Sequence, residues 1–416
     1  MKANKENERR RLVKKEYVVP FVLVTSLFFM WGFARAILDV LNKHFQMTMD
    51  ITLARTSLIQ ATTYIGYFLL AIPAGIFITR YGYRRGVVLG LTVFGIGSLM
   101  FIPGDWMNSF DFFLLSLFVI GCGLVVLETA ANPYITELGA PETASSRLNL
   151  AQSFNGLGCI LAPVIVGGIL FNNPEASVAV PYAVMGAAVL AVAVMFCFVK
   201  LPEITDDGAN DADANNEATA GSTHTGIGAA LNRLIHNRGF MSGVFALFCY
   251  EIAEISINTF FINYATDSGW MTPTTAATVL SICGLGLFMA VRVAGSFVMK
   301  TIAPQKVLAL CTVITTIGAL LVALNWGWLS RYSIFLCYAF EAIMFPTIFA
   351  ITIPKAGSDR KLASSLLMMT PLGGAVGTAL MGQAADMWGI ATAFAVPCAG
   401  YFLVMLYAMK QLRRSA

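Results

Sequence analysis

Long apolar segments alternate with short polar ones along nearly the whole chain. A membrane-spanning α-helix needs about 20 mostly apolar residues, and most of these segments approach or exceed that length. Bounded by turn and charge signals, they predict twelve transmembrane helices, at about residues 18–43, 56–79, 86–104, 110–136, 149–171, 180–200, 240–266, 275–299, 306–328, 332–354, 363–386 and 390–410. We therefore expect an all-α integral membrane fold without a second sizeable soluble domain.

Composition narrows the class of protein. Of the 416 residues, 57% are hydrophobic and 12% are charged, and the mean hydropathy is +0.72. Soluble domains are about half apolar and a quarter charged, so these few charges cannot cover a water-exposed surface. An ordinary cytosolic enzyme and a nucleic-acid-binding module are both excluded. The eight cysteines lie in apolar segments without a CxxC pair and the three histidines do not cluster, so we expect no metal site and no cofactor.

The placement of basic residues predicts the orientation. If the N-terminus is cytoplasmic, 22 of the 27 Lys and Arg residues fall on the cytoplasmic side, and only Lys43, Arg55 and Arg331 on the other. Cytoplasmic loops carry such an excess in membrane proteins. Both termini are therefore expected to be cytoplasmic, and the N-terminus shows no cleavable signal.

The longest polar stretch predicts a division of the chain. Residues 201–239 are rich in Asp, Asn, Ala, Gly and Thr, as expected of a flexible or partly helical cytoplasmic linker. It separates an N-terminal six-helix half, residues 1–200, from a C-terminal half, residues 240–416. The segment 132–135 recurs weakly as 345–348, at an offset of 213. Weak internal repetition is typical of transporters whose halves move around a central site.

Acidic residues inside the predicted helices are the first candidates for chemistry. A charge at mid-membrane costs about 2.5–3.5 kcal/mol on insertion scales, so an acidic residue inside a predicted span indicates a functional role. Five acidic residues lie inside the predicted spans: Asp39, Glu128, Glu251, Glu254 and Glu341. Asp39 shares a helix face with Arg35 and Asn42. Desolvation would favour the neutral form of this carboxyl group and the nearby guanidinium would favour the charged form, which suits the group to carry a proton. The alternative is an intrahelical Arg35–Asp39 pair that hides two charges.

The other acids have polar neighbours at helical spacing. Glu128 and Asn132 lie one turn apart and could bond hydroxyl groups, or form an interhelical polar clamp. Glu254 and Asn258 share a face with Glu251, which should line water or a site. Glu341 could pair with Arg292, which also lies inside a predicted span.

Amides and aromatics extend the candidate site. Two pairs have helical spacing, Gln60 with Tyr64 and Gln152 with Asn155. Sites for hydroxyl-rich ligands combine such groups with flat aromatic walls, and Trp31, Tyr64 and Tyr67 could supply them. An aromatic in a membrane helix is more often packing or an interface anchor.

Two sets of motifs carry a family resemblance. The pattern G-x-x-x-T-R-x-G-Y-R-R at residues 75–85 resembles the loop signature between spans 2 and 3 of the major facilitator superfamily, with Thr79 in place of the usual Asp. The segments SLFFMWGFARAILDVLNKHFQ, SLIQATTYIGYFLLAIPAGI, LETAANPYIT, RLNLAQSFNGLG and FPTIFAITI resemble the fucose:proton symporter family. This second likeness extends over nearly the whole chain.

The resemblance implies a two-half fold of twelve helices that imports sugar with protons by alternating access. The family's two functional acids correspond to Asp39, as the main proton-coupling group, and Glu128, which joins sugar recognition to coupling. Substrate-binding residues would be Glu128, Asn132, Gln152, Asn155, Gln60, Tyr64, Glu254 and Asn258. Conformational gating would involve Arg80, Arg84, Arg35 and Arg292. The expected partners are a sugar, a proton and the lipid bilayer, for a monomer in the bacterial cytoplasmic membrane.

Departures from the family pattern leave other functions open. Residues 34–38, Ala-Arg-Ala-Ile-Leu, replace an Asn-rich run, and span 7 is unusually acidic. The sugar could therefore be L-fucose or a related hexose, and glucose/galactose members of the family also carry an acid in span 7. The alternatives are an exporter of another small solute, an intramembrane aspartyl protease and a sugar sensor that does not transport.

Overall fold

The structure is a computed structural model that describes residues 13, 17–138, 144–173, 176–198, 227–299, 302–359, 363 and 366–415. Within these ranges the regular elements are all helices, which confirms the predicted all-α fold. The basic N-terminal tail, most of the predicted linker, Lys200, Lys300, Arg360 and Lys361 lie outside the described residues.

The first six spans form one half of the molecule. They are α2 (Val18–Met49), α3 and α4 (Leu53–Thr56 and Leu58–Tyr81), α5 and α6 (Tyr83–Leu99 and Phe101–Trp106), α7 (Phe110–Glu137), α8 (Ala144–Asn172) and α9 (Ala179–Phe198). Ser109 begins α7 by accepting a hydrogen bond from the Phe112 amide. Gly82, at a φ of 85°, permits the sharp join between α4 and α5.

The last six spans form the other half. They are α11 (Arg238–Asp267), α12 with the π-helix η4 and α13 (Pro273–Val279, Leu280–Leu285 and Gly286–Val298), α14 (Pro304–Ala323), α15 with α16 and the 3₁₀-helix η5 (Trp328–Glu341, Met344–Thr352 and Ile353–Asp359), α18 (Leu372–Trp388), and α19 with α20 (Ile390–Ala393 and Ala395–Ser415). Asn237 begins α11 by accepting from the amides of Gly239 and Phe240.

Helix lengths fit a membrane of ordinary thickness. Eleven apolar spans of 20–32 residues occur in the described ranges, and α18, with 17 residues, is the twelfth. A helix satisfies its own backbone hydrogen bonds, which lipid cannot do, so long apolar runs must fold this way. The chain is therefore a multi-pass membrane protein.

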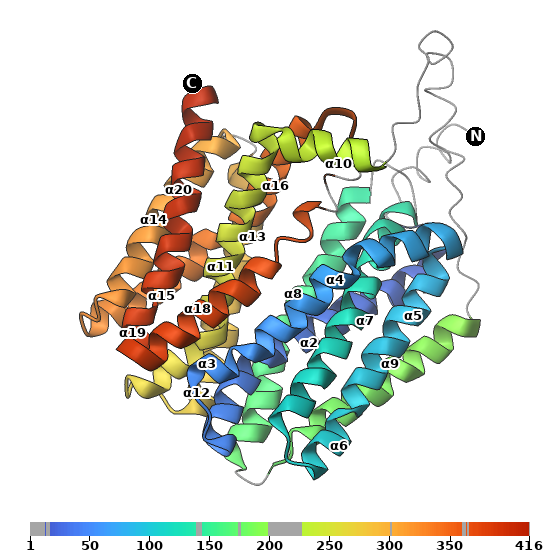
Figure 1. Cartoon of the computed structure of the whole chain (residues 1–416), viewed down its shortest axis with the longest axis horizontal. Helices are drawn as coiled ribbons and strands as arrows, with labels where there is room; N and C mark the ends of the chain where they lie inside the picture. Colours follow the sequence, from blue (N-terminus) through green and yellow to red (C-terminus); the bar gives the residue numbers. More distant parts are fainter. Residues whose placement is uncertain are drawn as a thin grey trace.

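The two halves meet along a few helices (Figure 1). In the first half, α8 packs along α2, and α7 packs between α4 and α5. In the second, α11 packs against α18 and α20, and α14 against α15 and α20. Contacts between the halves join α2 with α11, α4 and α3 with α18, and α8 with α12.

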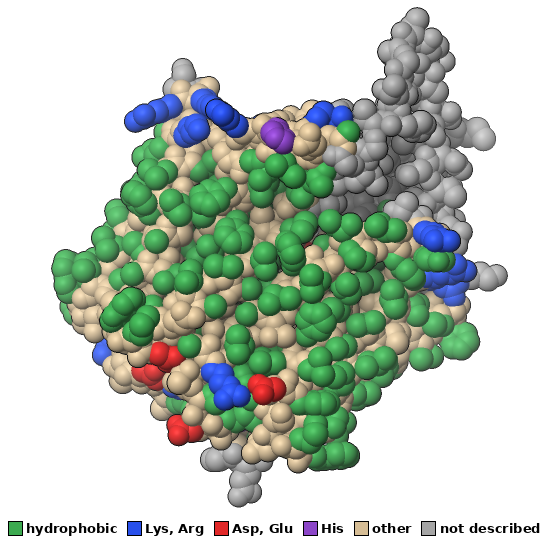
Figure 2. Space-filling view, viewed as in Figure 1, with side chains coloured by type: hydrophobic (Ala, Val, Ile, Leu, Met, Phe, Trp, Pro, Cys, Tyr) green, Lys and Arg blue, Asp and Glu red, His purple; other side chains and the backbone are tan. Residues whose placement is uncertain are grey.

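The charged surface marks the two ends of the molecule. Lys410, Arg413 and Arg414 are exposed at the end of α20, and the other end carries exposed Asp and Arg side chains (Figure 2). We call the end with the C-terminus the terminal side and the opposite end the far side. Hydrophobic side chains cover the visible face between them, as expected where lipid surrounds a protein.

One further helix lies where the linker was predicted. The helix α10 (Ile227–His236) crosses the terminal side of the second half and packs on α11 and η5 (Figure 1). It falls within the predicted linker, 201–239, of which residues 201–226 are not described. The proposed domain boundaries stay a prediction.

A proline creates the break in the tenth span. The ring of Pro346 clashes with the carbonyl four residues earlier, which belongs to Ala342. That carbonyl accepts a hydrogen bond from Arg292 Nε at 2.9 Å. The guanidinium thus joins α13 to the break between α15 and α16.

Glycines allow the closest helix crossing in the first half. A Cβ on Gly158 would lie 2.8 Å from the Phe33 backbone nitrogen, and one on Gly32 would meet the Asn155 carbonyl. Small residues let membrane helices approach in this way. The crossing fixes the middle of α2, which carries Trp31, Arg35 and Asp39.

We predict that Gly158→Val destabilises the protein far more than Gly168→Val. Both glycines lie in α8, so the helix-propensity cost is shared, but a Cβ at Gly168 meets nothing within 4 Å. Overpacking typically costs about 1–3 kcal/mol. Thermal unfolding of the purified variants in detergent measures the difference. Equal melting temperatures would contradict a tight α2–α8 crossing.

Candidate functional site

A polar pocket lies between the two halves, inside the helical spans. It contains about 190 Å³ of free space, part of it open to solvent, and is lined by Arg35 and Asp39 of α2, Gln60 and Tyr64 of α4, and Ile255 and Asn258 of α11. The sequence predicted all of these except Ile255 as site residues. Helical spacing brings each pair from one helix to the same face, and the packing of α2, α4 and α11 brings the faces together.

Asp39 is held by a neutral partner. Its Oδ1 accepts a hydrogen bond of 2.9 Å from Gln60 Nε2, and only 7% of the residue is exposed. Gln60 Oε1 is buried and has no hydrogen-bond partner among the described residues. The pair therefore keeps an unused acceptor at the pocket wall.

Arg35 reaches across to the other half. Its Nη2 lies 4.0 Å from Glu254 Oε1, and its Nε donates to Tyr64 Oη at 3.3 Å. In the part of the chain that is described, the ion-pair partner of Arg35 is Glu254 and not Asp39. The simple intrahelical Arg35–Asp39 pair, left open by the sequence, is not the arrangement found here.

A second pocket lies on α2 beside the first. It also contains about 190 Å³ of free space, part of it open to solvent, and is lined by Leu27, Phe28, Trp31, Leu127, Glu128 and Ala131. The indole Nε1 of Trp31 donates to Tyr67 Oη at 3.0 Å, which fixes the ring at the pocket wall. Glu128 thus stands beside a flat aromatic surface. As the structure stands, each pocket has room for little more than a water molecule.

Several buried amides keep unused hydrogen-bonding atoms. Asn258 Oδ1, Asn132 Oδ1 and both side-chain polar atoms of Asn42 have no partner in the described residues. Such atoms are costly when left unmet in a protein interior. A ligand rich in hydroxyl groups, or water, would satisfy them.

One of the two predicted α8 residues, Asn155, contributes to the helix crossing. Asn155 Nδ2 donates to the Phe28 carbonyl at 3.1 Å, and Cys159 Sγ lies 3.4 Å from the Gly32 carbonyl. Gln152 lies nearly one turn before Asn155 and is half-buried. Asn155, which the sequence had suggested as a ligand-binding residue, therefore uses its side-chain nitrogen to hold α8 to α2.

Two other acids of the second half are buried outside the first pocket. Glu341 is fully buried, accepts a hydrogen bond from Tyr401 Oη, and has no partner on Oε1 among the described residues. Arg292 bonds the next residue's carbonyl, and its pairing with Glu341 stays a prediction. Glu251 is 4% exposed and packs beside Gly373 of α18.

The two predicted loop arginines stay within the first half. Arg84 donates from Nε to the Phe196 carbonyl at 3.1 Å and also bonds the Cys197 carbonyl, so it joins the start of α5 to the end of α9. The guanidinium carbon of Arg80 lies 5.4 Å from the centre of the Tyr81 ring. Their gating role stays a prediction.

Contacts between the halves gather toward the far side, and sequence reasoning missed them. Asp386 of α18 accepts from the backbone amides of Leu53 and Ala54 at 2.9 and 2.8 Å. The helices α2 and α11 meet at a row of polar contacts that we call the α2–α11 seam: Arg35 with Glu254 at 4.0 Å, Gln46 with Asn263 at 2.8 Å, and Lys43 with Asp267 at 2.8 Å. In the sequence, the one feature that could have indicated these contacts is the set of charged residues at the ends of the predicted spans.

Taken together, a polar site between two helical halves, with the contacts between the halves gathered toward one side, is typical of a membrane transport protein. Residues 21–368 match the Major Facilitator Superfamily, and the chain belongs to that family. In the described residues, no group of three or more His, Cys, Asp or Glu could hold a metal ion.

Relatives place the chain within the family. It is 34% identical to the L-fucose-proton symporter of Escherichia coli (strain K12), over 95% of this chain and 93% of that protein. It is 32% identical to a glucose/galactose transporter of Brucella abortus biovar 1 (strain 9-941), over 95% of both. These relatives are transporters, and the predicted resemblance to the fucose:proton symporter family is confirmed.

A solved structure confirms the fold. The crystal structure of the transporter FucP in the outward conformation matches with a TM-score of 0.69 at 34% identity, covering 95% of this chain and 99% of that one. The two-half arrangement of twelve helices is therefore that of the Major Facilitator Superfamily.

We predict that Asp386→Ala exposes the start of α3. The Leu53 and Ala54 amides would lose a charged acceptor, and hydrogen bonds to charged groups contribute about 1.5–3 kcal/mol. Hydrogen–deuterium exchange of a peptide over residues 50–57 should become roughly tenfold faster or more. Asp111→Ala is the control, because Asp111 pairs with the Arg55 side chain at 3.4 Å and bonds neither amide. Unchanged exchange in Asp386→Ala would rule out this capping contact.

Proposed function

We propose that this protein carries a hexose or 6-deoxyhexose sugar across the membrane together with a proton, by alternating access. The observation that carries the proposal is the interfacial pocket, in which the buried carboxyl group of Asp39 faces groups from both halves. The similarity to an L-fucose-proton symporter over 95% of the chain supports the same function.

Asp39 is proposed as the proton carrier. In a low-dielectric site, burying a protonated, neutral carboxyl group costs little free energy, whereas burying the charged carboxylate costs much more. Its partner, the Gln60 amide, is neutral and can bond either form. Protonation from one side and release to the other would therefore not require Asp39 to find a new partner on the protein.

The sugar is proposed to bind across both pockets. Glu128 and Trp31 offer a carboxyl group and a flat wall in one pocket, and Tyr64 and Asn258 offer further polar groups in the other. Asn132 and Gln60 supply the buried acceptors described above. The remaining proposed contacts are those of Glu254, Gln152 and Asn155. Because each pocket is small, the two would join when the halves separate around the ligand.

The state shown is proposed to be closed to the outside. Its inter-half contacts lie toward the far side, where Asp386 and the α2–α11 seam hold the halves together. The basic residues on the terminal side favour a cytoplasmic location for both termini, in a bacterial cytoplasmic membrane. The far side is then the outside, and opening there would require these contacts to break.

The alternative substrate is D-glucose or D-galactose. The 32% identical relative that carries this name supports it. Span 7 carries Glu251 and Glu254, as expected from the acid that glucose/galactose members have there. Glu254, which pairs with Arg35 at the edge of the pocket, offers a further acceptor for the additional hydroxyl of a hexose.

We predict that adding the right sugar makes the medium more alkaline. A pH electrode in a lightly buffered, de-energised suspension of cells expressing the protein would follow sequential additions of L-fucose, D-glucose, D-galactose, D-arabinose and L-rhamnose. A proton that enters with the sugar leaves the medium, so the pH should rise promptly with the transported sugar. Cells without the protein are the control. No response to any sugar, with expression confirmed, would count against proton symport of these sugars.

We predict that Asp39→Asn abolishes sugar accumulation driven by a pH gradient and spares sugar exchange. Asn keeps an acceptor for Gln60 but cannot carry the proton. Proteoliposomes with an imposed gradient measure accumulation, and counterflow of labelled sugar at equal pH measures exchange. Asp111→Asn, at an exposed site on the far side, should retain both. Accumulation by Asp39→Asn would show that another group carries the proton.

A further inference from the structure

The α2–α11 seam contains one residue that also belongs to the proton site. The two helices run in the same direction, since residues 35, 43 and 46 of α2 meet residues 254, 267 and 263 of α11. Arg35 is four residues before Asp39, and both line the same pocket. The seam and the proton-carrying carboxyl therefore share a single cation.

Arg35 has room to move, and Glu254 has little. The side chain of Arg35 is 41% exposed, whereas that of Glu254 is 11% exposed. The separation of 4.0 Å between Nη2 and Oε1 is at the outer limit for an ion pair. The long, flexible side chain of Arg35 can place its guanidinium group near Asp39 on its own helix or near Glu254 on the opposite half.

The groups around Asp39 leave Arg35 as the deciding charge. They are Arg35 on α2, Gln60 and Tyr64 on α4, Cys159 on α8, Glu254 on α11 and Tyr338 on α15. Tyrosine and cysteine are neutral near pH 7, so the guanidinium is the cation within this set. When Asp39 is charged, it competes for the guanidinium with Glu254, and the carboxyl groups of Glu251 and Glu128 lie within electrostatic reach of Arg35 as well. When Asp39 is protonated, Glu254 is the carboxyl group that lies within ion-pair distance, at 4.0 Å.

We propose that Arg35 is the positioning residue that couples protonation of Asp39 to closure of the outer side. A proton from the outside neutralises Asp39, and the guanidinium moves to Glu254 on the opposite half. This draws α2 toward α11 and favours the Gln46–Asn263 and Lys43–Asp267 contacts farther along the seam. The structure shows the arrangement after this step, with Arg35 on Glu254 and the seam formed. The inference rests on the proposed function.

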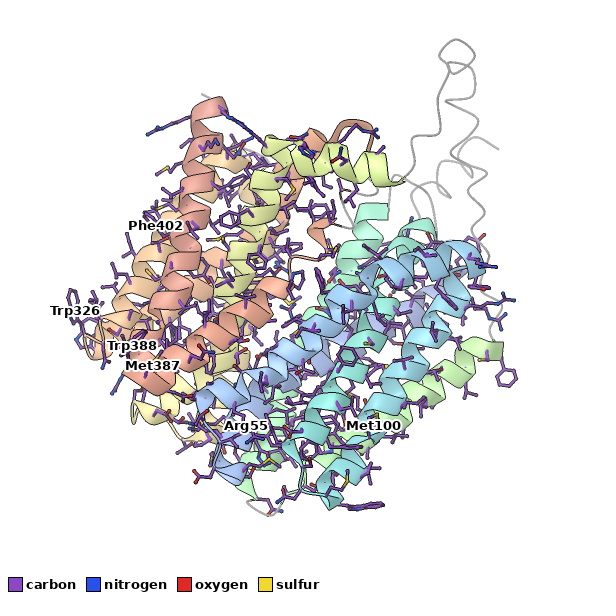
Figure 3. The ribbon with its side chains drawn as sticks, in the orientation of Figure 1. Arg55, Met100, Trp326, Met387, Trp388 and Phe402 are labelled. Carbon is purple, nitrogen blue, oxygen red and sulfur yellow. The ribbon has the colours of Figure 1, made fainter. Side chains whose placement is uncertain are left out.

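The test separates closure from transport. Spin labels on Met107→Cys and Trp326→Cys, at exposed positions on the far ends of the two halves, report the outer distance (Figure 3 labels Trp326). The exposed Cys197 and Cys283 are changed to serine first. Without sugar, wild type should shift toward the shorter distance when the pH falls from mildly alkaline to mildly acidic. Arg35→Gln and Glu254→Gln should lose this shift, and the double variant should add nothing further.

Transport by the same variants completes the test. Accumulation on a pH gradient should fall about tenfold or more in Arg35→Gln and Glu254→Gln, as coupling energies between sites allow. Arg35→Lys keeps the charge and should retain part of the acid-induced shift, which a purely structural role of the guanidinium would not predict. Arg55→Gln, whose partner Asp111 lies in the same half, is the matched control.

Each outcome bears on one of the two proposals. Variants that keep the wild-type distance shift and accumulation would overturn the role of Arg35 and leave symport standing. A wild type without any acid-induced shift would do the same. A wild type that shifts through Arg35 but accumulates no sugar would support the switch and overturn sugar symport. If Arg35→Gln does not fold, Glu254→Gln and Arg35→Lys decide alone.

Discussion

The cost of placing charge in a membrane interior governs this structure. A guanidinium or carboxylate at mid-membrane must have a partner or water, and a twelve-helix protein offers few places for either. The central residues of α2 meet this requirement in two ways. Asp39 is bonded by the amide of Gln60, and Arg35 is shared between Tyr64 and a carboxylate of the other half. The halves are therefore linked through a charge that neither half satisfies alone.

The rest of the architecture positions α2. The close crossing with α8 at Gly32 and Gly158 holds its middle, and the seam with α11 holds its far end. In the second half, Pro346 breaks the tenth span and frees a carbonyl that Arg292 then bonds. Both arginines inside the spans, Arg35 and Arg292, therefore lie where a carboxylate or a backbone carbonyl can accept their hydrogen bonds. A buried arginine requires such acceptors.

Sequence alone predicted the spans because lipid leaves the backbone no alternative to the helix. It also grouped Arg35 with Asp39 and Gln60 with Tyr64, since residues four apart share a face. It could not predict that Arg35 would pair with Glu254, because 219 residues separate them and only packing of the halves brings them together. For the same reason it could not predict that Asp386 would cap α3 of the other half. Nor could it predict that Arg147, between the predicted spans 110–136 and 149–171, would be fully buried and donate a hydrogen bond to the Ile135 carbonyl.

A contact that joins the halves must also be able to break. Breaking a tight buried ion pair by removing one partner costs about 3–5 kcal/mol, and a carrier that had to overcome this in every cycle would be slowed by roughly two to four orders of magnitude. The Arg35–Glu254 pair avoids this because it is long, at 4.0 Å, and its guanidinium is partly exposed. A second carboxylate on the same helix gives the guanidinium another place to go. Burying these acidic residues costs free energy. The same residues allow the guanidinium to change its carboxylate partner with a small loss of interaction energy.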